Sequence, residues 1–103
     1  MSIRDFGVSM SASTLQHKLK DGRIKDGNYA YWTFPKGLPE GIEEGSKMWV
    51  ANGGEWVGYF IIHDQLDANP NEACFFSESF VSAHCGPRSA FRGYTWNVPE
   101  GCE

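Results

Sequence analysis

The stretch KMWVANGGEWVGYFII, residues 47–62, decides the fold. Two apolar runs in it flank Asn52-Gly53-Gly54. Asparagine and glycine accept the positive φ that a tight turn between twisted strands needs. The runs are rich in Trp, Val, Tyr, Phe and Ile, which favour a pleated, half-buried surface. The stretch therefore predicts a β-hairpin and, with it, a small β-rich protein.

Gly58 interrupts the second run of this hairpin. A glycine inside a strand marks a bulge, a bend or a place where another part of the backbone approaches closely. We therefore expect the second strand to bend strongly at Gly58.

The segments before the hairpin predict a strand, a helix and another strand. Ile3–Met10 has the composition of a short strand. Residues 11–16 have the pattern of a helix start, within which Ser13 and Gln16 have the spacing of a capping box, and Gly22 is the predicted cap at the other end. The aromatic segment Asn28–Phe34 predicts the next strand.

The chain beyond the hairpin predicts one more strand and leaves one segment open. Phe91–Val98 has the pattern of a final strand, with a bend at Gly93. Residues 73–83 are apolar with interspersed serines, and their periodicity fits a strand and a short helix equally well.

These elements predict a mainly β protein of the α+β class, with five to six strands and one or two short helices. So few strands remove their exposed edges best by closing into a barrel. Gly58 and Gly93 would supply the curvature that closure needs. A chain of 103 residues has the length of one domain, so we expect residues 1–103 to form a single domain.

The charge of the chain is unevenly divided. The net charge is -4, with +1 in residues 1–50 and -5 in residues 51–103. This balance argues against strong non-specific binding to nucleic acid, which depends on many Lys and Arg contacts to phosphate.

The cysteines predict no zinc site and no disulfide framework. Cys74, Cys85 and Cys102 are odd in number, and no two of them form a CxxC pair. We expect three reduced thiols, no metal and no cofactor. No apolar run approaches the ~20 residues of a membrane span, and the first ten residues lack a signal-peptide core. The sequence thus predicts a cytoplasmic protein without a membrane partner.

The order of these elements and three short motifs resemble the PUA-like superfold and, within it, the ASCH domains. The motifs are GSKMWV at 45–50, VGYF at 57–60 and the closing FRGY at 91–94. They follow a helix that ends in Gly22-Arg23 and a loop rich in Pro and Gly. The resemblance covers about residues 8–97 and implies a small β-barrel with a ligand cleft beside it.

As a family, PUA-like domains bind RNA, modified bases or nucleotide-like ligands, and this is the function that the resemblance implies. Some ASCH members hydrolyse modified cytidine with a Lys, a Thr and a Glu, the first two near a Gly-Arg-Lys-Thr type segment. This chain has Ile24 in place of that Lys, and no Thr follows. Lys25 is the nearest substitute, and Glu78 is the candidate proton shuttle.

Five residues are our candidates for ligand binding. Aromatic rings beside Lys or Arg provide base stacking together with phosphate contact. The alternative is that the strand aromatics fill the core and that the arginine lies along the barrel with its head in solvent. The candidates are Lys25, Tyr29, Tyr31, Trp32 and Arg92.

Three hypotheses for function follow, and the sequence favours a binding module over an enzyme. The first is a module that recognises RNA, a modified base or a nucleotide. The second is an acidic protein–protein interaction or inhibitor protein, motivated by the charge of -5 in residues 51–103. The third is an ASCH-type amidohydrolase that uses Lys25 and Glu78.

Overall fold

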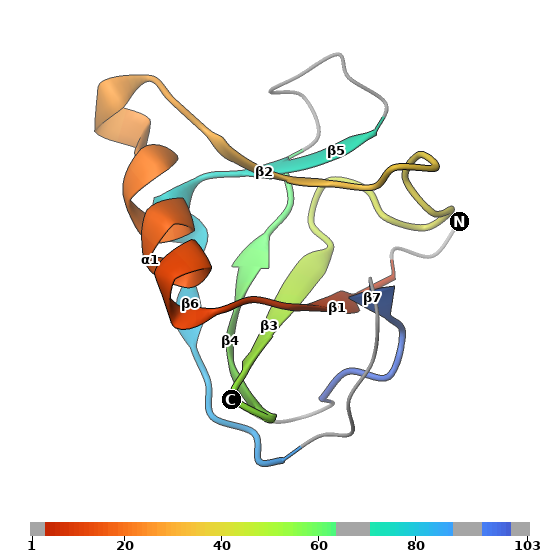
Figure 1. Cartoon of the computed structure of the whole chain (residues 1–103). Coiled ribbons are helices and arrows are strands. Elements are labelled where there is room, and N and C mark those ends of the chain that lie inside the picture. The colour runs from red at the N-terminus through yellow and green to blue at the C-terminus, as the bar shows by residue number, and fades with distance from the viewer. Residues whose placement is uncertain (1–3, 64–70, 88–93, 100–103) are drawn as a thin grey trace.

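A computed structural model describes residues 4–63, 71–87 and 94–99, which form two β-sheets and one α-helix (Figure 1). The protein is therefore of the α+β class and consists mostly of strands, as the sequence predicts. In chain order its elements are β1 (Phe6–Ser9), α1 (Ala12–Asp21), the 3-10 helix η1 (Ile24–Asp26), β2 (Ala30–Thr33), β3 (Lys47–Asn52), β4 (Glu55–Ile61), β5 (Glu72–Phe75), the 3-10 helix η3 (Ser77–Ser79), β6 (Val81–Ser82) and β7 (Tyr94–Thr95).

The larger sheet has five strands in the order β6-β4-β3-β1-β7, and the smaller sheet pairs β2 with β5. β1 runs parallel to β3, and the other pairs are antiparallel. In Figure 1 the smaller sheet lies above the larger one, and α1 lies along one side of both.

The described strands do not close into the barrel that the sequence predicts. The two edges of the larger sheet are β6 and β7, which have only two residues each. The end of β4 reaches the smaller sheet through a single bridge between Ile62 and Phe75. Within the described residues, this bridge replaces the continuous ladder that closure would require.

The hairpin forms as predicted, from β3 and β4. Its turn consists of Gly53 at φ 61° and Gly54 at φ 84°. Two positive φ values in a two-residue loop define the turn that matches the twist of the flanking strands. The register shifts between Val50 and Ala51, because Val50 pairs with Gly58 and Ala51 pairs with Trp56. Val57 is therefore the extra residue of a β-bulge.

Gly58 lies next to this bulge and is approached closely by the backbone of β6. A Cβ atom on Gly58 would lie 2.4 Å from the carbonyl oxygen of Val81 and 2.5 Å from the ring of Phe80. Two of the three explanations offered by the sequence, the bulge and the close approach, are thus confirmed together.

The helix starts within the predicted segment, residues 11–16, but its N-cap is not the serine of the predicted capping box. Ser11, not Ser13, is its N-cap, and the Ser11 hydroxyl accepts a hydrogen bond from the Thr14 N–H at 3.2 Å. The reason is that Met10 still belongs to the sheet region, where its N–H donates to the Ala51 carbonyl at 2.9 Å. Gly22 is the C-cap, as predicted. In the described part of the chain, no helix is long and apolar enough to cross a bilayer.

The segment 73–83, for which the sequence favoured neither strand nor helix, contains both. β5 ends at Phe75, the single turn of η3 follows, and β6 begins at Val81. Of the predicted strand Phe91–Val98, the described residues form a strand only at Tyr94–Thr95, and Gly93 lies outside the described residues.

The core has two parts, one on each face of the larger sheet. Met48 and Val50 of β3 face the main cluster between the two sheets, whereas Trp49 and Ala51 face a second cluster. This alternation follows the period of two in a strand. The Trp49 and Trp56 rings meet edge to face in the second cluster, with ring centroids 6.3 Å apart.

The cysteines differ from the prediction of three thiols. Cys74 lies outside any disulfide bond and is buried in β5. Cys85 is disulfide-bonded. The odd count and the absence of CxxC argued against a disulfide framework of several bridges, but they do not exclude a single bond between distant cysteines.

Candidate ligand-binding site

The structure does not bring the predicted ligand residues into one cleft. Trp32 lines a hollow at the far end of β2, and Tyr29 lines a different one, beside the end of α1. Lys25 lies exposed on η1 and lines neither of them. Arg92 lies outside the described residues.

Tyr31 lies on the opposite side of β2 from Trp32, because successive residues of a strand point to opposite faces. It is 43% exposed, and the Nζ atom of Lys18 lies 4.7 Å from its ring centroid. Partial burial lowers the pKa of Lys18, and the charges of Asp21 and Glu72 oppose that shift. The sequence thus predicted a basic residue beside this ring, but the partner is Lys18 rather than Lys25.

Glu78, the candidate proton shuttle, has a structural contact. Its Oε2 atom accepts a hydrogen bond from the Ile24 N–H at 2.8 Å. This bond fixes η3 to the start of η1, next to Lys25 in the chain. The side chains of Glu78 and Lys25 are both exposed.

The hollow that contains Trp32 is the best candidate for a ligand site. It has a volume of about 460 Å³, which is within the usual range for small-molecule sites. We name it the ring hollow, because aromatic side chains and prolines dominate its lining, and among the described residues that line it Lys36 is the only charged one. Its lining residues are Trp32, Thr33, Phe34, Pro35, Lys36, Gly37, Leu38, Pro39 and Tyr94.

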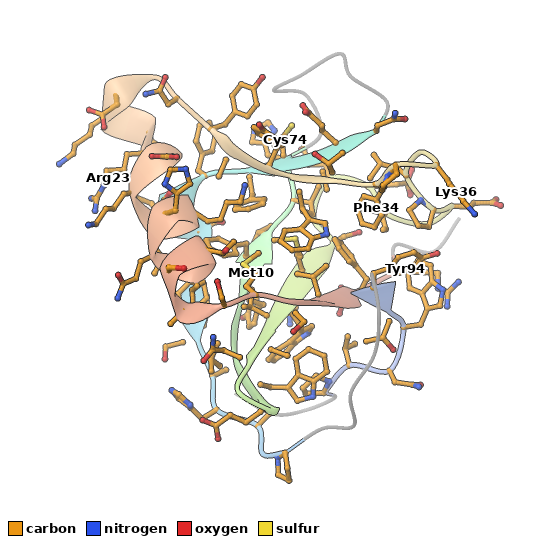
Figure 2. The ribbon with its side chains drawn as sticks, viewed as in Figure 1. Met10, Arg23, Phe34, Lys36, Cys74 and Tyr94 are labelled. Carbon is orange, nitrogen blue, oxygen red and sulfur yellow. The ribbon has the colours of Figure 1, made fainter. Side chains whose placement is uncertain are left out.

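The local sequence explains why the ring hollow forms. Pro35 follows the end of β2 and starts a turn, in which the Gly37 N–H donates to the Phe34 carbonyl at 2.9 Å. Gly37 has φ 91°, a conformation that glycine adopts without steric cost. The turn folds the chain back after β2, and Figure 2 shows Phe34, Lys36 and Tyr94 together at this end of the molecule.

The aromatic rings that line the ring hollow pack against the hydrophobic core. Phe34 is 4% exposed and contacts Phe6 of the core, with ring centroids 5.7 Å apart. Phe34 also meets Tyr94 edge to face at 5.3 Å. Tyr94 is 36% exposed, so part of its surface is available to a ligand. The core therefore fixes the position of Tyr94 from one side while the other side faces solvent.

A second hollow adjoins the first and shares Leu38 and Pro39 with it. We name it the Arg4 hollow, and its volume is about 450 Å³. Glu40 and Glu43 also line it. A row of rings connects the two hollows, because Tyr94 contacts Trp96 at 5.4 Å and the guanidinium carbon of Arg4 lies 3.6 Å from a ring centroid of Trp96.

Sequence reasoning identified one residue of this region, Trp32, and missed Lys36, Tyr94 and Arg4. The signal for Lys36 was present, since it lies between two prolines in a loop that follows an aromatic strand. Tyr94 appeared only in the motif of the family resemblance. Nothing in the sequence indicates that Arg4 and Trp96, more than ninety residues apart in numbering, are in contact.

Comparisons with known proteins add no homologue to this description. No protein-family model, curated protein or solved structure matches the chain. The described residues also contain no group of three His, Cys, Asp or Glu side chains that could hold a metal ion.

Proposed function

We propose that this protein is a small ligand-binding module that takes a flat ring, such as a nucleobase or a modified base, into the ring hollow. The observation that carries the proposal is that the partly exposed ring of Tyr94 lines the same hollow as Trp32 and Lys36. Stacking of one base on such rings is worth roughly 1–3 kcal/mol.

The family resemblance is part of this proposal. The order of strand, helix, strand and hairpin supports an ASCH-like or PUA-like domain. In that family, ligands bind beside the barrel, and the ring hollow lies at the end of β2, outside the main core. The barrel itself would require strand pairing beyond the pairs described above.

A cytoplasmic location, where nucleotides are abundant, would fit this function. The disulfide at Cys85 counts against that location, because disulfides persist mainly in oxidising compartments. The state of Cys85 in the purified protein therefore bears directly on where the protein acts.

The proposal is tested by titrating the protein with nucleosides, nucleoside 5′-monophosphates and short single-stranded oligonucleotides, with tryptophan fluorescence as the signal. We expect binding of at least one of these ligands, and a decrease in affinity with added salt for the phosphorylated ones. If none of them binds, the proposal is wrong.

Two variants locate the binding. Trp32→Leu and Tyr94→Leu keep apolar contacts but remove the stacking surface, so each should weaken binding by about tenfold or more. Tyr31→Leu is the matched control, because Tyr31 is also an exposed β2 aromatic but lies on the other face of the strand. Equal losses in all three variants would contradict a site in the ring hollow.

The other two hypotheses find less support. The described carboxylates of residues 51–87 are Glu55, Glu72 and Glu78, and they belong to three different elements. The hydrogen bond from the Ile24 N–H gives Glu78 a structural contact, so it provides no support for Glu78 as the proton shuttle of an amidohydrolase. Isolation of one stoichiometric protein partner, without any ring ligand, would favour the interaction protein instead.

A further inference from the structure

Arg4 is held in place more firmly than is usual for an exposed arginine. Its backbone N–H donates to the Gly41 carbonyl at 2.8 Å, and its guanidinium carbon lies over Trp96, 3.6 Å from a ring centroid. The stem of the side chain lies against Gly41, where a Cβ atom would be 2.8 Å from both Cγ and Cδ of Arg4. Three contacts thus fix the backbone, the aliphatic part of the side chain and the guanidinium of Arg4.

The guanidinium of Arg4 remains available to a ligand. Glu40 and Glu43 line the same hollow, yet among the ion pairs of the described residues neither carboxylate is paired with Arg4. Stacking on Trp96 covers a face of the guanidinium and leaves the N–H groups at its edge. A planar fork of N–H donors matches a phosphate or carboxylate in two parallel hydrogen bonds.

Arg4 lies in the hollow that adjoins the ring hollow. Leu38 and Pro39 form the ridge that the two hollows share. The contacts from Tyr94 to Trp96 and from Trp96 to Arg4 make a second connection between them. A ligand whose ring lies against Tyr94 can therefore extend past Leu38 and Pro39 toward Arg4.

We propose that Arg4 binds the phosphate of the ligand whose ring occupies the ring hollow, and that the ligand is a nucleoside monophosphate. This inference rests on the proposed function and specifies its ligand class. The carboxylates of Glu40 and Glu43 limit the negative charge that the Arg4 hollow accepts. A single phosphate can bind the guanidinium, whereas the two carboxylates repel the additional negative charge of a triphosphate.

The experiment compares the affinity of the protein for a nucleoside, its 5′-monophosphate and its 5′-triphosphate at constant ionic strength. We expect the monophosphate to bind about tenfold more tightly than the nucleoside, as one charge-assisted contact would give. We expect the triphosphate to bind more weakly than the monophosphate. A dinucleotide with a 5′-phosphate, measured beside these, distinguishes a free nucleotide from the end of a strand.

The variants assign this preference to Arg4. Arg4→Gln should lower the affinity for the monophosphate to that for the nucleoside and leave the affinity for the nucleoside unchanged. Arg4→Lys should restore only part of the preference, because lysine lacks the planar fork. Trp96→Leu keeps the charge of Arg4 but removes its support, so it should also reduce the preference. Replacement of Glu40 and Glu43 by glutamine should raise the affinity for the triphosphate.

Lys36→Gln is the matched control, because Lys36 is the charged residue of the neighbouring hollow. If the preference for phosphate disappears with Lys36→Gln and survives Arg4→Gln, the inference about Arg4 is wrong. Nucleoside binding without any preference for the monophosphate would also overturn it, while the proposed function would stand. Absence of binding by the nucleoside and both nucleotides would instead refute the proposed function.

Discussion

The buried hydroxyl of Ser77 accepts a hydrogen bond from the Gly22 N–H at 3.0 Å, and so joins η3 to the end of α1 across 55 residues of sequence. The same hydroxyl donates to the carbonyl of Lys18 in the last turn of the helix. The Ser77 N–H donates to the Gly22 carbonyl at 2.5 Å. Ser77 therefore satisfies polar groups that the end of a helix leaves without partners.

Replacement of Ser77 tests this contact. Ser77→Ala leaves the Gly22 N–H and the Lys18 carbonyl without their side-chain partner in a buried place, so it should lower the free energy of unfolding by about 1–3 kcal/mol. Urea unfolding measures the change. Ser82→Ala, an exposed serine in β6, is the control and should change stability by less than about 0.5 kcal/mol. Equal effects of the two substitutions would show that the contact to α1 contributes nothing.

The close approach of β6 makes Gly58 intolerant of a side chain. Gly58→Val places atoms against the Val81 carbonyl, and we expect a loss of roughly 3 kcal/mol in thermal or urea unfolding. Gly27→Ala is the control, because Gly27 has φ 70° but no atom within 4 Å of its Cβ position. That variant bears only the backbone cost of about 1 kcal/mol. An unchanged midpoint for Gly58→Val would mean that β6 does not pack against this position.

The local features of this fold were predictable, and the contacts between distant segments were not. The turn at Gly53-Gly54 and the bulge beside Gly58 depend on backbone preferences of a few adjacent residues, which a sequence displays directly. The choice of Ser11 over Ser13 as N-cap depended on how far β1 extends, and this is set by pairing with β3. The predicted barrel is not confirmed, because among the described residues only the bridge between Ile62 and Phe75 joins the strands of the two sheets.

The same distinction holds for the candidate site. The alternation of β2 predicts that Trp32 and Tyr31 point to opposite faces, and they do. Because they are adjacent in a strand, Tyr31 and Trp32 cannot line the same cleft. Only the fold brings Lys36 and Tyr94 into the hollow of Trp32 and Arg4 into the adjoining hollow, because the loop after β2, strand β7 and the segment before β1 converge at one end of the molecule.

The disulfide is testable by labelling of thiols. In the unfolded protein without reductant, an alkylating reagent should modify Cys74 and leave Cys85 unmodified. Addition of a reductant before unfolding should expose Cys85 to the reagent. Peptide mass spectrometry identifies the labelled sites. Modification of Cys85 in the absence of reductant would support the reduced thiols that the sequence predicted and, with them, a cytoplasmic location.

Lys18 should make stability depend on pH in the alkaline range. Burial lowers the pKa of Lys18 below its ordinary value of 10.5, so the folded protein releases this proton at a lower pH than the unfolded protein does. Between the two pKa values the unfolded state binds more protons, and stability therefore rises with pH. The cost of burying the charged lysine is present at neutral pH and disappears as the pH approaches 10.5.

The comparison that isolates this effect is Lys18→Met, which has a similar length and no charge. The free energy of unfolding of the wild type relative to this variant should increase as the pH rises from neutral toward 10.5. Lys20→Met, on an exposed residue of the same helix, is the control and should show a smaller dependence. A difference between wild type and Lys18→Met that is constant with pH would refute the prediction.

The most direct test of the ring hollow uses the side-chain indole N–H signals of the four tryptophans in a proton–nitrogen NMR spectrum. The protein is titrated with the four common nucleoside 5′-monophosphates. We predict that the Trp32 signal shifts with saturation, because Trp32 lines the ring hollow, whereas Trp49 and Trp56 in the second cluster keep their positions. No shift of any indole signal, or shifts at Trp49 and Trp56 alone, would contradict a base-binding site in the ring hollow.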